Sequence, residues 1–286
     1  LNLFEANIFY PANQYSLALS ENLIGWAPFS IPLYAISHDP VFTHNTLRLL
    51  TFVLCGFGAY LLSYRYTNNR YAAFIAGVCF AFFSYRFTIQ LHLLAMQWVP
   101  FMLLYLDRFF YSLKIRDILV STFFFILAAL SSWYVGIFTG IIVLIYFVGY
   151  LILDKKLREK IFSRQAMGML LLSLAIILLV FAPLALPYFH ASKMYDAERG
   201  LDDPMKTSWS LDPLPIFQLI GYVAVLFAFI GLLLPLNTEK NNDLIRSYIR
   251  KQRIPILFAI IGVVSYILML GPIFNIGGNE TGILTP

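Results

Sequence analysis

The sequence predicts an all-α polytopic membrane protein, a bundle of about eight spanning helices preceded by an interfacial segment. Hydrophobic residues make up 60% of the 286 residues, whereas only 12% are charged. From Leu49 to Asn279, long uncharged stretches alternate with short polar loops, and no interval is long enough for a soluble domain. A bilayer core requires roughly 20 apolar residues per helix, because no water is present there to satisfy the backbone.

The first segment, residues 1–46, contains no Lys or Arg, and we expect it to form part of an outer loop. Within it, residues 22–37 are apolar but interrupted by Pro28 and Pro32, which favours an interfacial or re-entrant segment over a ninth span. An outside N-terminus needs an upstream signal peptide or helix, and Leu1 is not an initiator Met. We therefore expect the chain to be a fragment.

The membrane bundle is expected over residues 47–271. Its longest uncharged block, Ile118 to Leu153, would measure about 54 Å as one helix, which is too long for a single pass. We expect this block to turn back near Ser131 and Ser132. Residues 272–286 then begin an outer loop that is incomplete at its C-terminal side. The eight expected spans are residues 47–64, 71–85, 93–110, 117–131, 133–153, 166–188, 216–235 and 254–271.

Lysine and arginine are divided unequally between the two sets of loops. One set carries fifteen of the 20 basic residues, which assigns it to the cytoplasm and places both ends of the fragment outside. The net charge of +5 then reflects topology and anionic lipid, so we expect no nucleic-acid partner. The five basic residues expected outside are Arg48, Arg86, Lys193, Arg199 and Lys206.

All four tryptophans fall on the expected outer side, as do the four histidines, whereas tyrosines occur toward both sides. Indole rings stack on sugar faces and on apolar lipid while offering one N–H donor, so this asymmetry favours an outer-face site. Interfacial anchoring alone is the alternative. The tryptophans are Trp26, Trp98, Trp133 and Trp209, and the histidines are His38, His44, His92 and His190.

A group of polar residues follows the second expected span, namely Arg86, Gln90, His92 and Gln97. If residues 86–97 are helical, all of these except His92 share one face. Polar side chains at membrane depth usually face a bundle interior or a wet cavity. The alternative is that Arg86 reaches the head groups and the glutamines bond neighbouring helices.

The sequence contains few motifs of known chemistry. No two histidines show the close spacing of metal ligands on one helix. We find no nucleophile elbow. We also find no Gly-rich phosphate loop, and its absence from the sequence disfavours an ATP-driven pump. Outer-loop carboxylates such as Glu5 and Glu21 could hold a divalent cation or accept a proton from a hydroxyl. For each of them, a solvated loop charge is the default interpretation.

Several segments resemble a known superfamily of bacterial membrane enzymes. They read NLFEANIFYP and YSLALSENLIG near the start, FSYRFTIQLHLLAMQWVP and LSSWYVGIF farther along, and LGPIFNIGGNETGILTP near the end. With the segment NTLRLLTFVLCGFGAYLL, they span nearly the whole chain. Together they resemble the GT-C glycosyltransferase superfamily.

The resemblance implies transfer of a sugar from a polyprenyl-phosphate donor to an acceptor, on the outer face of a bacterial inner membrane. It implies a first outer loop with an acidic catalytic motif, and this chain begins inside that loop. We therefore expect the preceding helix and its Asp or Glu pair to lie upstream of Leu1. In this fragment, Glu5 and Glu21 are the candidate catalytic carboxylates, with Mg²⁺ or Mn²⁺ as a candidate cofactor.

The candidate substrate-binding residues follow from the same resemblance and from the expected side of the membrane. Arg86 or Arg199 would neutralise the donor phosphate, and Trp133 with Tyr134 would form a stacking wall. Gln90, His92 and Gln97 complete the set. The alternatives are a transporter or a lipid or sugar flippase, and a non-catalytic assembly partner; the chain lacks the internal repeat that transport would favour.

Overall fold

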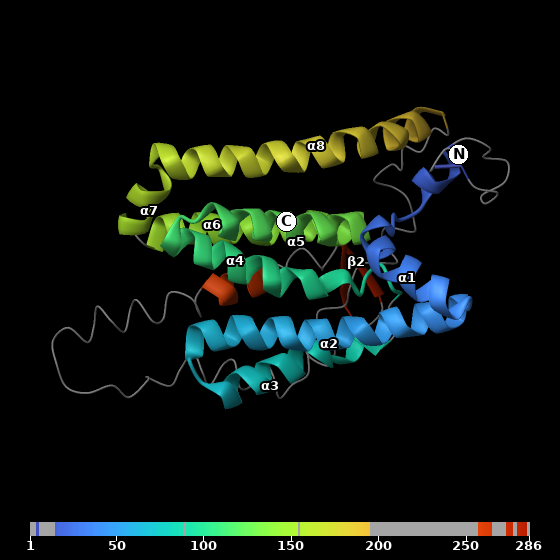
Figure 1. The fold of residues 1–286 in the computed structure, drawn as a ribbon, viewed down its shortest axis with the longest axis horizontal. Helices are drawn as coiled ribbons and strands as arrows, with labels where there is room; N and C mark the ends of the chain where they lie inside the picture. Colours follow the sequence, from blue (N-terminus) through green and yellow to red (C-terminus); the bar gives the residue numbers. More distant parts are fainter. Residues whose placement is uncertain are drawn as a thin grey trace. The chain divides into compact units, whose positions relative to one another are not determined.

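The computed structural model describes residues 4–5, 15–87, 90–153, 155–194, 257–264, 273–276 and 279–284. This part of the chain is predominantly helical (Figure 1). It divides into two compact units, of which the second comprises residues 83–88, 145–149 and 199–286 and the first comprises the rest. The span expected at residues 216–235 lies outside the described residues, as do Arg199 and Trp209.

The elements up to residue 194 follow one another closely, as Figure 1 shows. Short 3-10 turns precede or interrupt the longer helices. In chain order the elements are η1 (Ser16–Leu19), η2 (Ile24–Trp26), α1 (Ala27–Ser37), α2 (Pro40–Thr67), α3 (Arg70–Ala81), η3 (Ser84–Phe87), η4 (Ala95–Gln97), α4 (Trp98–Ser112), α5 (Ile115–Ser131), α6 (Trp133–Leu153), α7 (Lys155–Ile161) and α8 (Arg164–Met194).

Among the described residues, three helices are long and apolar enough to cross a membrane. They are α2, α8 and residues 133–152 of α6. The helical membrane protein that the sequence predicts is thus confirmed in its coarse form. The helices α3, α4 and α5 coincide with expected spans but have only 12, 15 and 17 residues. The number of eight spans stays a prediction.

Asparagine and aspartate side chains set the limits of α2 and α3. The Asp39 carboxylate accepts hydrogen bonds from the backbone N–H groups of Val41 (2.8 Å) and Phe42 (3.2 Å) and thereby begins α2. Asn68 ends α2 in the left-handed region, at φ 51°. Asn69 then accepts from the first N–H groups of α3. Two successive residues therefore reverse the chain.

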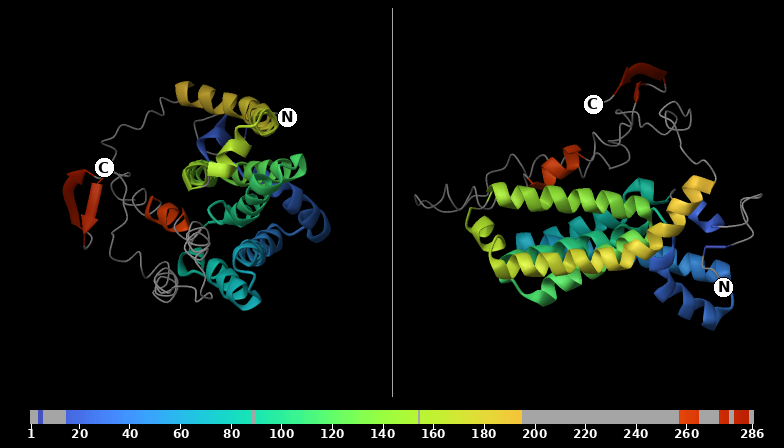
Figure 2. Two further views of the ribbon diagram at one scale, coloured as in Figure 1. Left: turned by 90° about the vertical axis from the view of Figure 1, so that its left-hand side faces the viewer. Right: turned by 90° about the horizontal axis from the view of Figure 1, so that it is seen from above.

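Small residues allow α2 and α3 to pack closely, side by side (Figures 1 and 2). A Cβ atom added at Gly77 would lie only 2.7 Å from the carbonyl oxygen of Gly56. This close backbone approach is typical of helices that associate in a membrane, where van der Waals contact replaces the hydrophobic effect.

The expected turn near Ser131 and Ser132 is confirmed. α5 ends at Ser131, and Ser132 is extended, with φ −169° and ψ 135°. A Cβ atom added at Gly136 would lie 2.6 Å from the Cβ of Ala129, although seven residues separate the two along the chain. In a continuous helix those residues would be about 10 Å apart. The chain therefore reverses at Ser132.

Two features differ from the sequence-based expectations. Described residues between 86 and 97 are not a continuous helix but consist of η3, turns and η4, so the expected single polar face is wrong. In the expected outer loop at residues 272–286, strands β1 (Ile273–Ile276) and β2 (Asn279–Leu284) pair antiparallel. The sequence between them is Gly277-Gly278, a dipeptide typical of tight hairpin turns.

The second unit also includes a short helical segment, residues 257–264. Its Phe258 ring lies 6.1 Å from the Tyr146 ring of α6, centroid to centroid. The side chain of Leu257 occupies the space that a Cβ atom at Gly149 would need. Gly149 therefore permits the segment to approach the α6 backbone.

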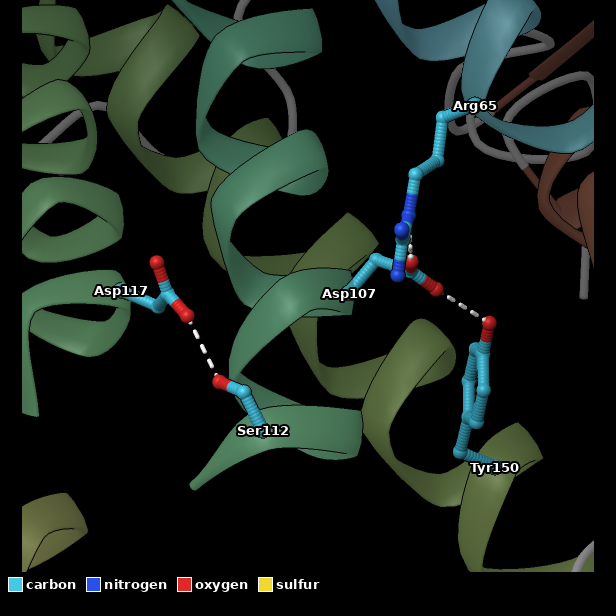
Figure 3. A network of polar contacts seen from close by, with 5 residues as sticks. All are labelled: Arg65, Asp107, Ser112, Asp117 and Tyr150. Atoms are coloured by element: carbon cyan, nitrogen blue, oxygen red, sulfur yellow. Dashed lines mark hydrogen bonds and ion pairs between the residues drawn. The ribbon is translucent and has the colours of Figure 1, made fainter. Parts of the chain in front are cut away.

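A buried carboxylate joins three helices in the first unit. Asp107 on α4, only 1% exposed, accepts hydrogen bonds from Arg65 Nε on α2 (2.9 Å) and from the Tyr150 hydroxyl on α6 (2.7 Å), as Figure 3 shows. A buried charge requires such partners, because its desolvation is otherwise uncompensated. Nearby, the Ser112 hydroxyl donates to Asp117 at 2.6 Å, between α4 and α5.

We predict that Asp107→Ala destabilises the bundle by about 1.5–3 kcal/mol, because Arg65 and Tyr150 would lose a charged acceptor. Unfolding of the detergent-solubilised protein, followed by circular dichroism, measures this loss. Tyr150→Phe serves as the control, since it removes only one hydrogen bond and should cost less. An Asp107→Ala variant as stable as the native chain would contradict a structural role for this carboxylate.

Candidate functional site

The carboxylate of Glu21 lies at the start of α6, although 112 positions separate it from its partner in the sequence. Its Oε2 accepts a hydrogen bond of 2.8 Å from the backbone N–H of Trp133, the first residue of that helix. Helix N-termini have unsatisfied N–H groups and a positive partial charge, so they attract an anion. Within the described residues, Glu21 Oε1 makes no hydrogen bond.

Asn22 contacts the side chain of the same tryptophan. With its amide oxygen oriented toward the indole, Asn22 accepts from Trp133 Nε1 at 3.0 Å and donates to the carbonyl of Leu130 on α5. Two consecutive residues of the N-terminal segment therefore fix the backbone and the ring of Trp133. Asn22 is buried and Glu21 is half-buried, so this contact is shielded from water on one side.

Aromatic rings from α8 and from the N-terminal segment complete the arrangement. The Tyr188 ring packs edge-on against Trp133 (5.3 Å between centroids) and against Phe4 (5.7 Å). The buried Tyr188 hydroxyl lies beside Trp133 and Asn22. We refer to Glu21, Asn22, Trp133 and Tyr188 as the Glu21 cluster. It is built from the N-terminal segment, α6 and α8, which meet at one end of the first unit (Figure 2).

A glycine explains why the N-terminal segment can dock here. Gly25, at the centre of η2, lies against the last turn of α5, where an added Cβ would come within 2.4 Å of Ser131 Oγ and 2.6 Å of the Leu127 carbonyl. Backbone atoms cannot move away as a flexible side chain can. Only glycine at position 25 therefore lets η2 pack directly on α5. Gly25 is four residues after Glu21, so this contact also places Glu21 near the end of α5.

Residues of η2, α1 and α2 line an apolar groove of about 500 Å³. Its walls include Leu23, Trp26, Tyr34, His44 and Leu47. We refer to it as the α1–α2 groove. Tyr34 and His44 are the two titratable residues in this lining, which contains no carboxylate, lysine or arginine. Such a lining suits an uncharged hydrocarbon with few polar atoms.

Two tryptophans of this end, Trp26 and Trp98, belong to one packed core. Trp26 is 2% exposed and lies 6.4 Å from Trp98, whose ring stacks on Phe29 and Phe124. Gln97, which is fully buried, accepts from Trp98 Nε1 at 3.1 Å when its amide is oriented to match. These residues therefore hold η2 and α1 against α4 and α5, and this favours a structural role for Gln97.

The structure brings together only part of the residue set that the sequence predicts. Glu21 and Trp133 are in direct contact. Glu5 is exposed and follows Phe4, which packs on Tyr188. Tyr134 is 55% exposed beside Trp133.

In the part of the chain that the structure describes, neither Gln90 nor His92 makes a hydrogen bond or ring contact with this cluster. Gln90 is exposed and His92 is half-buried. Arg86 is buried in the second unit, where its guanidinium carbon lies 5.9 Å from the centroid of the Phe83 ring. Arg199 lies outside the described residues. Their substrate-binding roles stay predictions.

Sequence reasoning missed Tyr188. It is 55 positions from Trp133 and belongs to a helix with an apolar stretch of ordinary composition. Only the packing of α8 beside α6 brings the two rings together. No local pattern in the sequence marks such a residue.

A divalent cation has no preformed site in the part of the chain that the structure describes. No three His, Cys, Asp or Glu side chains there are grouped as metal ligands. Glu21 and Glu5 remain the candidate oxygen ligands from the sequence, and the cation stays a prediction.

The two ends of the first unit differ in composition as the sequence suggests. Trp26, Trp98 and Trp133 gather at the end that holds the Glu21 cluster. Tyr150 lies 17 residues after Trp133 on α6, which corresponds to about 26 Å at 1.5 Å per residue. Arg65 on α2 bonds the same carboxylate as Tyr150 and so lies at that other end. The assignment of either end to a compartment stays a prediction.

Comparison of the chain with protein-family models, with curated proteins and with solved structures gives no match. The resemblance to the GT-C superfamily therefore remains an expectation from the sequence segments alone.

We predict that Gly25→Ala separates the N-terminal segment from α5 and destabilises the protein by about 1–3 kcal/mol, the usual cost of overpacking. Thermal unfolding in detergent measures the loss. Gly168→Ala is the matched control, because a Cβ at that position of α8 meets nothing within 4 Å. Equal stability of the two variants would show that the close approach of η2 to α5 is not required.

Proposed function

We propose that the full-length protein transfers a sugar from a polyprenyl-phosphate donor to an acceptor hydroxyl, at the membrane face that bears the Glu21 cluster. The observation that carries this proposal is the position of Glu21: its carboxylate is fixed at the start of α6, beside two aromatic rings and next to an apolar groove. This arrangement combines a proton acceptor, a stacking surface and a place for a lipid chain.

The geometry of Glu21 supports a role as general base. One carboxylate oxygen is engaged by the Trp133 backbone N–H, which fixes the side chain, while Oε1 is left to accept a proton. In the proposed step, Oε1 takes the proton of the acceptor hydroxyl as the acceptor oxygen bonds to the anomeric carbon. The bond from that carbon to the phosphate oxygen breaks, and polyprenyl phosphate leaves with the electron pair.

Trp133 and Tyr188 supply aromatic surface beside this carboxylate. Their rings are held at 87° to each other, so their faces point in different directions. An aromatic face packs well against the apolar face of a sugar, and the indole N–H is already used by Asn22. These rings would therefore orient a sugar mainly by contact area and shape.

The α1–α2 groove supports the choice of a lipid-linked donor. It adjoins η2, and Leu23 in its wall lies two residues after Glu21 in the chain. Its volume is within the range of about 300–1,000 Å³ that is usual for ligand sites. A prenyl chain in this groove would bring its phosphate to the same end of the bundle as the Glu21 carboxylate.

The decisive experiment is Glu21→Gln in the full-length protein, reconstituted with a lipid-linked sugar. The glutamine oxygen can still accept the Trp133 hydrogen bond, but the side chain cannot take a proton. We predict a loss of product formation of about 10²–10⁴-fold with an unchanged unfolding temperature. Glu159→Gln is the matched control, because Glu159 is an exposed carboxylate on α7, remote from the Glu21 cluster.

Full activity of Glu21→Gln would remove Glu21 from the catalytic role. Movement of the sugar across vesicles without a covalent product, in the native protein, would instead favour the transporter or flippase alternative.

A further inference from the structure

The short helix α7 lies between two helices that are suited to cross a membrane. It occupies most of the ten residues that link α6 to α8, and its sequence is KKLREKI. If α6 and α8 both cross the membrane, a link of ten residues keeps α7 close to the membrane surface. Leu157 and Ile161 are buried, at 4% and 0% exposure, which turns one side of α7 toward the bundle.

Several basic side chains on and around α7 are exposed. Lys155, Arg158 and Lys160 are exposed, as is Arg164 at the start of α8. The Lys160 ammonium donates to the carbonyl of Tyr111 at the end of α4, which ties α7 to the link between α4 and α5. That link adds the exposed residues Lys114 and Arg116. We refer to these six residues as the α7 patch.

Few negative charges offset the patch. Asp117 is buried and accepts from the Ser112 hydroxyl, so Glu159 is the one exposed carboxylate among residues 111–117 and the described part of 155–164. Two aromatic side chains accompany the basic ones, namely Phe162 at 58% and Tyr111 at 49% exposure. Aromatic rings with basic side chains are typical of the head-group layer of a membrane.

We propose that the α7 patch binds the phosphate groups of anionic phospholipids in the adjoining leaflet. The positive charges match the phosphodiester, and the exposed aromatic rings suit a lipid better than a soluble anion. Each basic residue near an anionic surface contributes about fivefold to the affinity. The interaction is electrostatic, so salt weakens it. It does not depend on the sugar-transfer proposal, because α7 is remote from the Glu21 cluster along both α6 and α8.

The test compares two double variants that each remove two exposed positive charges. Lys155→Gln/Arg158→Gln alters the patch and spares the Lys160 contact, whereas Arg70→Gln/Lys193→Gln alters exposed residues elsewhere. Native mass spectrometry of the full chain, released from mixed micelles, measures binding of phosphatidylglycerol against phosphatidylcholine. Soluble glycerol phosphate forms a third arm.

We expect the patch variant to bind phosphatidylglycerol about 25-fold more weakly. The control variant should remain within twofold of the native chain, and neither phosphatidylcholine nor glycerol phosphate should compete. Three results would overturn the proposal: an unchanged affinity of the patch variant, an equal loss of affinity in both variants, or effective competition by glycerol phosphate. If the double variant fails to fold, Arg164→Gln alone should still show a loss of about fivefold, and no loss would have the same meaning.

Discussion

The arrangement of α2, α4 and α6 depends on one buried carboxylate. Asp107 is the one charged residue among the buried side chains of α4, where an unpaired charge would be strongly unfavourable. Arg65 and Tyr150 reach it from two other helices and supply donors at hydrogen-bond distance. Apolar helices can slide or rotate against one another at little cost in a membrane, because lipid tails replace side-chain contacts. A charged triad with fixed geometry removes that freedom and so defines the register of the three helices.

A second polar contact organises the opposite end of the same unit. Glu21 and Asn22 hold Trp133, and Tyr188 and Phe4 pack around it. Between the two ends, small residues such as Gly56 and Gly77 pack closely. Buried hydroxyl groups also join helices there: Ser121 donates to the Met102 carbonyl at 3.0 Å, and Thr122 bonds Ser173 at 2.5 Å. The contacts that involve charged groups therefore lie toward the two ends of the unit. The Glu21 cluster and the α1–α2 groove lie at one of these ends, where the proposed chemistry would occur.

The sequence-based expectations failed where local context overrides hydrophobicity. Residues 86–97 are rich in apolar side chains, but the described part forms turns and 3-10 structure, and Gln97 is buried against Trp98 instead of lining a continuous polar face. The end of the chain, expected as a loop, contains a β-hairpin because β-branched and aromatic residues flank a Gly-Gly pair. Neither segment has the apolar spacing of 3.6 residues that predicts a helix, so periodicity alone does not give its structure.

The sequence by itself determined the helical membrane character, the break at Ser132 and the grouping of Trp26, Trp98 and Trp133 at one end of the described bundle. These follow from uncharged length, from helix geometry and from charge placement, all of which are local properties of a chain. Only the tertiary structure decided that Glu21 caps α6, that Tyr188 joins Trp133, and that Asp107 is shared by three helices. The partners in these contacts lie 42 to 112 positions apart in the chain, with Tyr188 and Trp133 between those limits. Contacts of such range depend on which helix faces pack together, and hydrophobicity does not specify that in lipid.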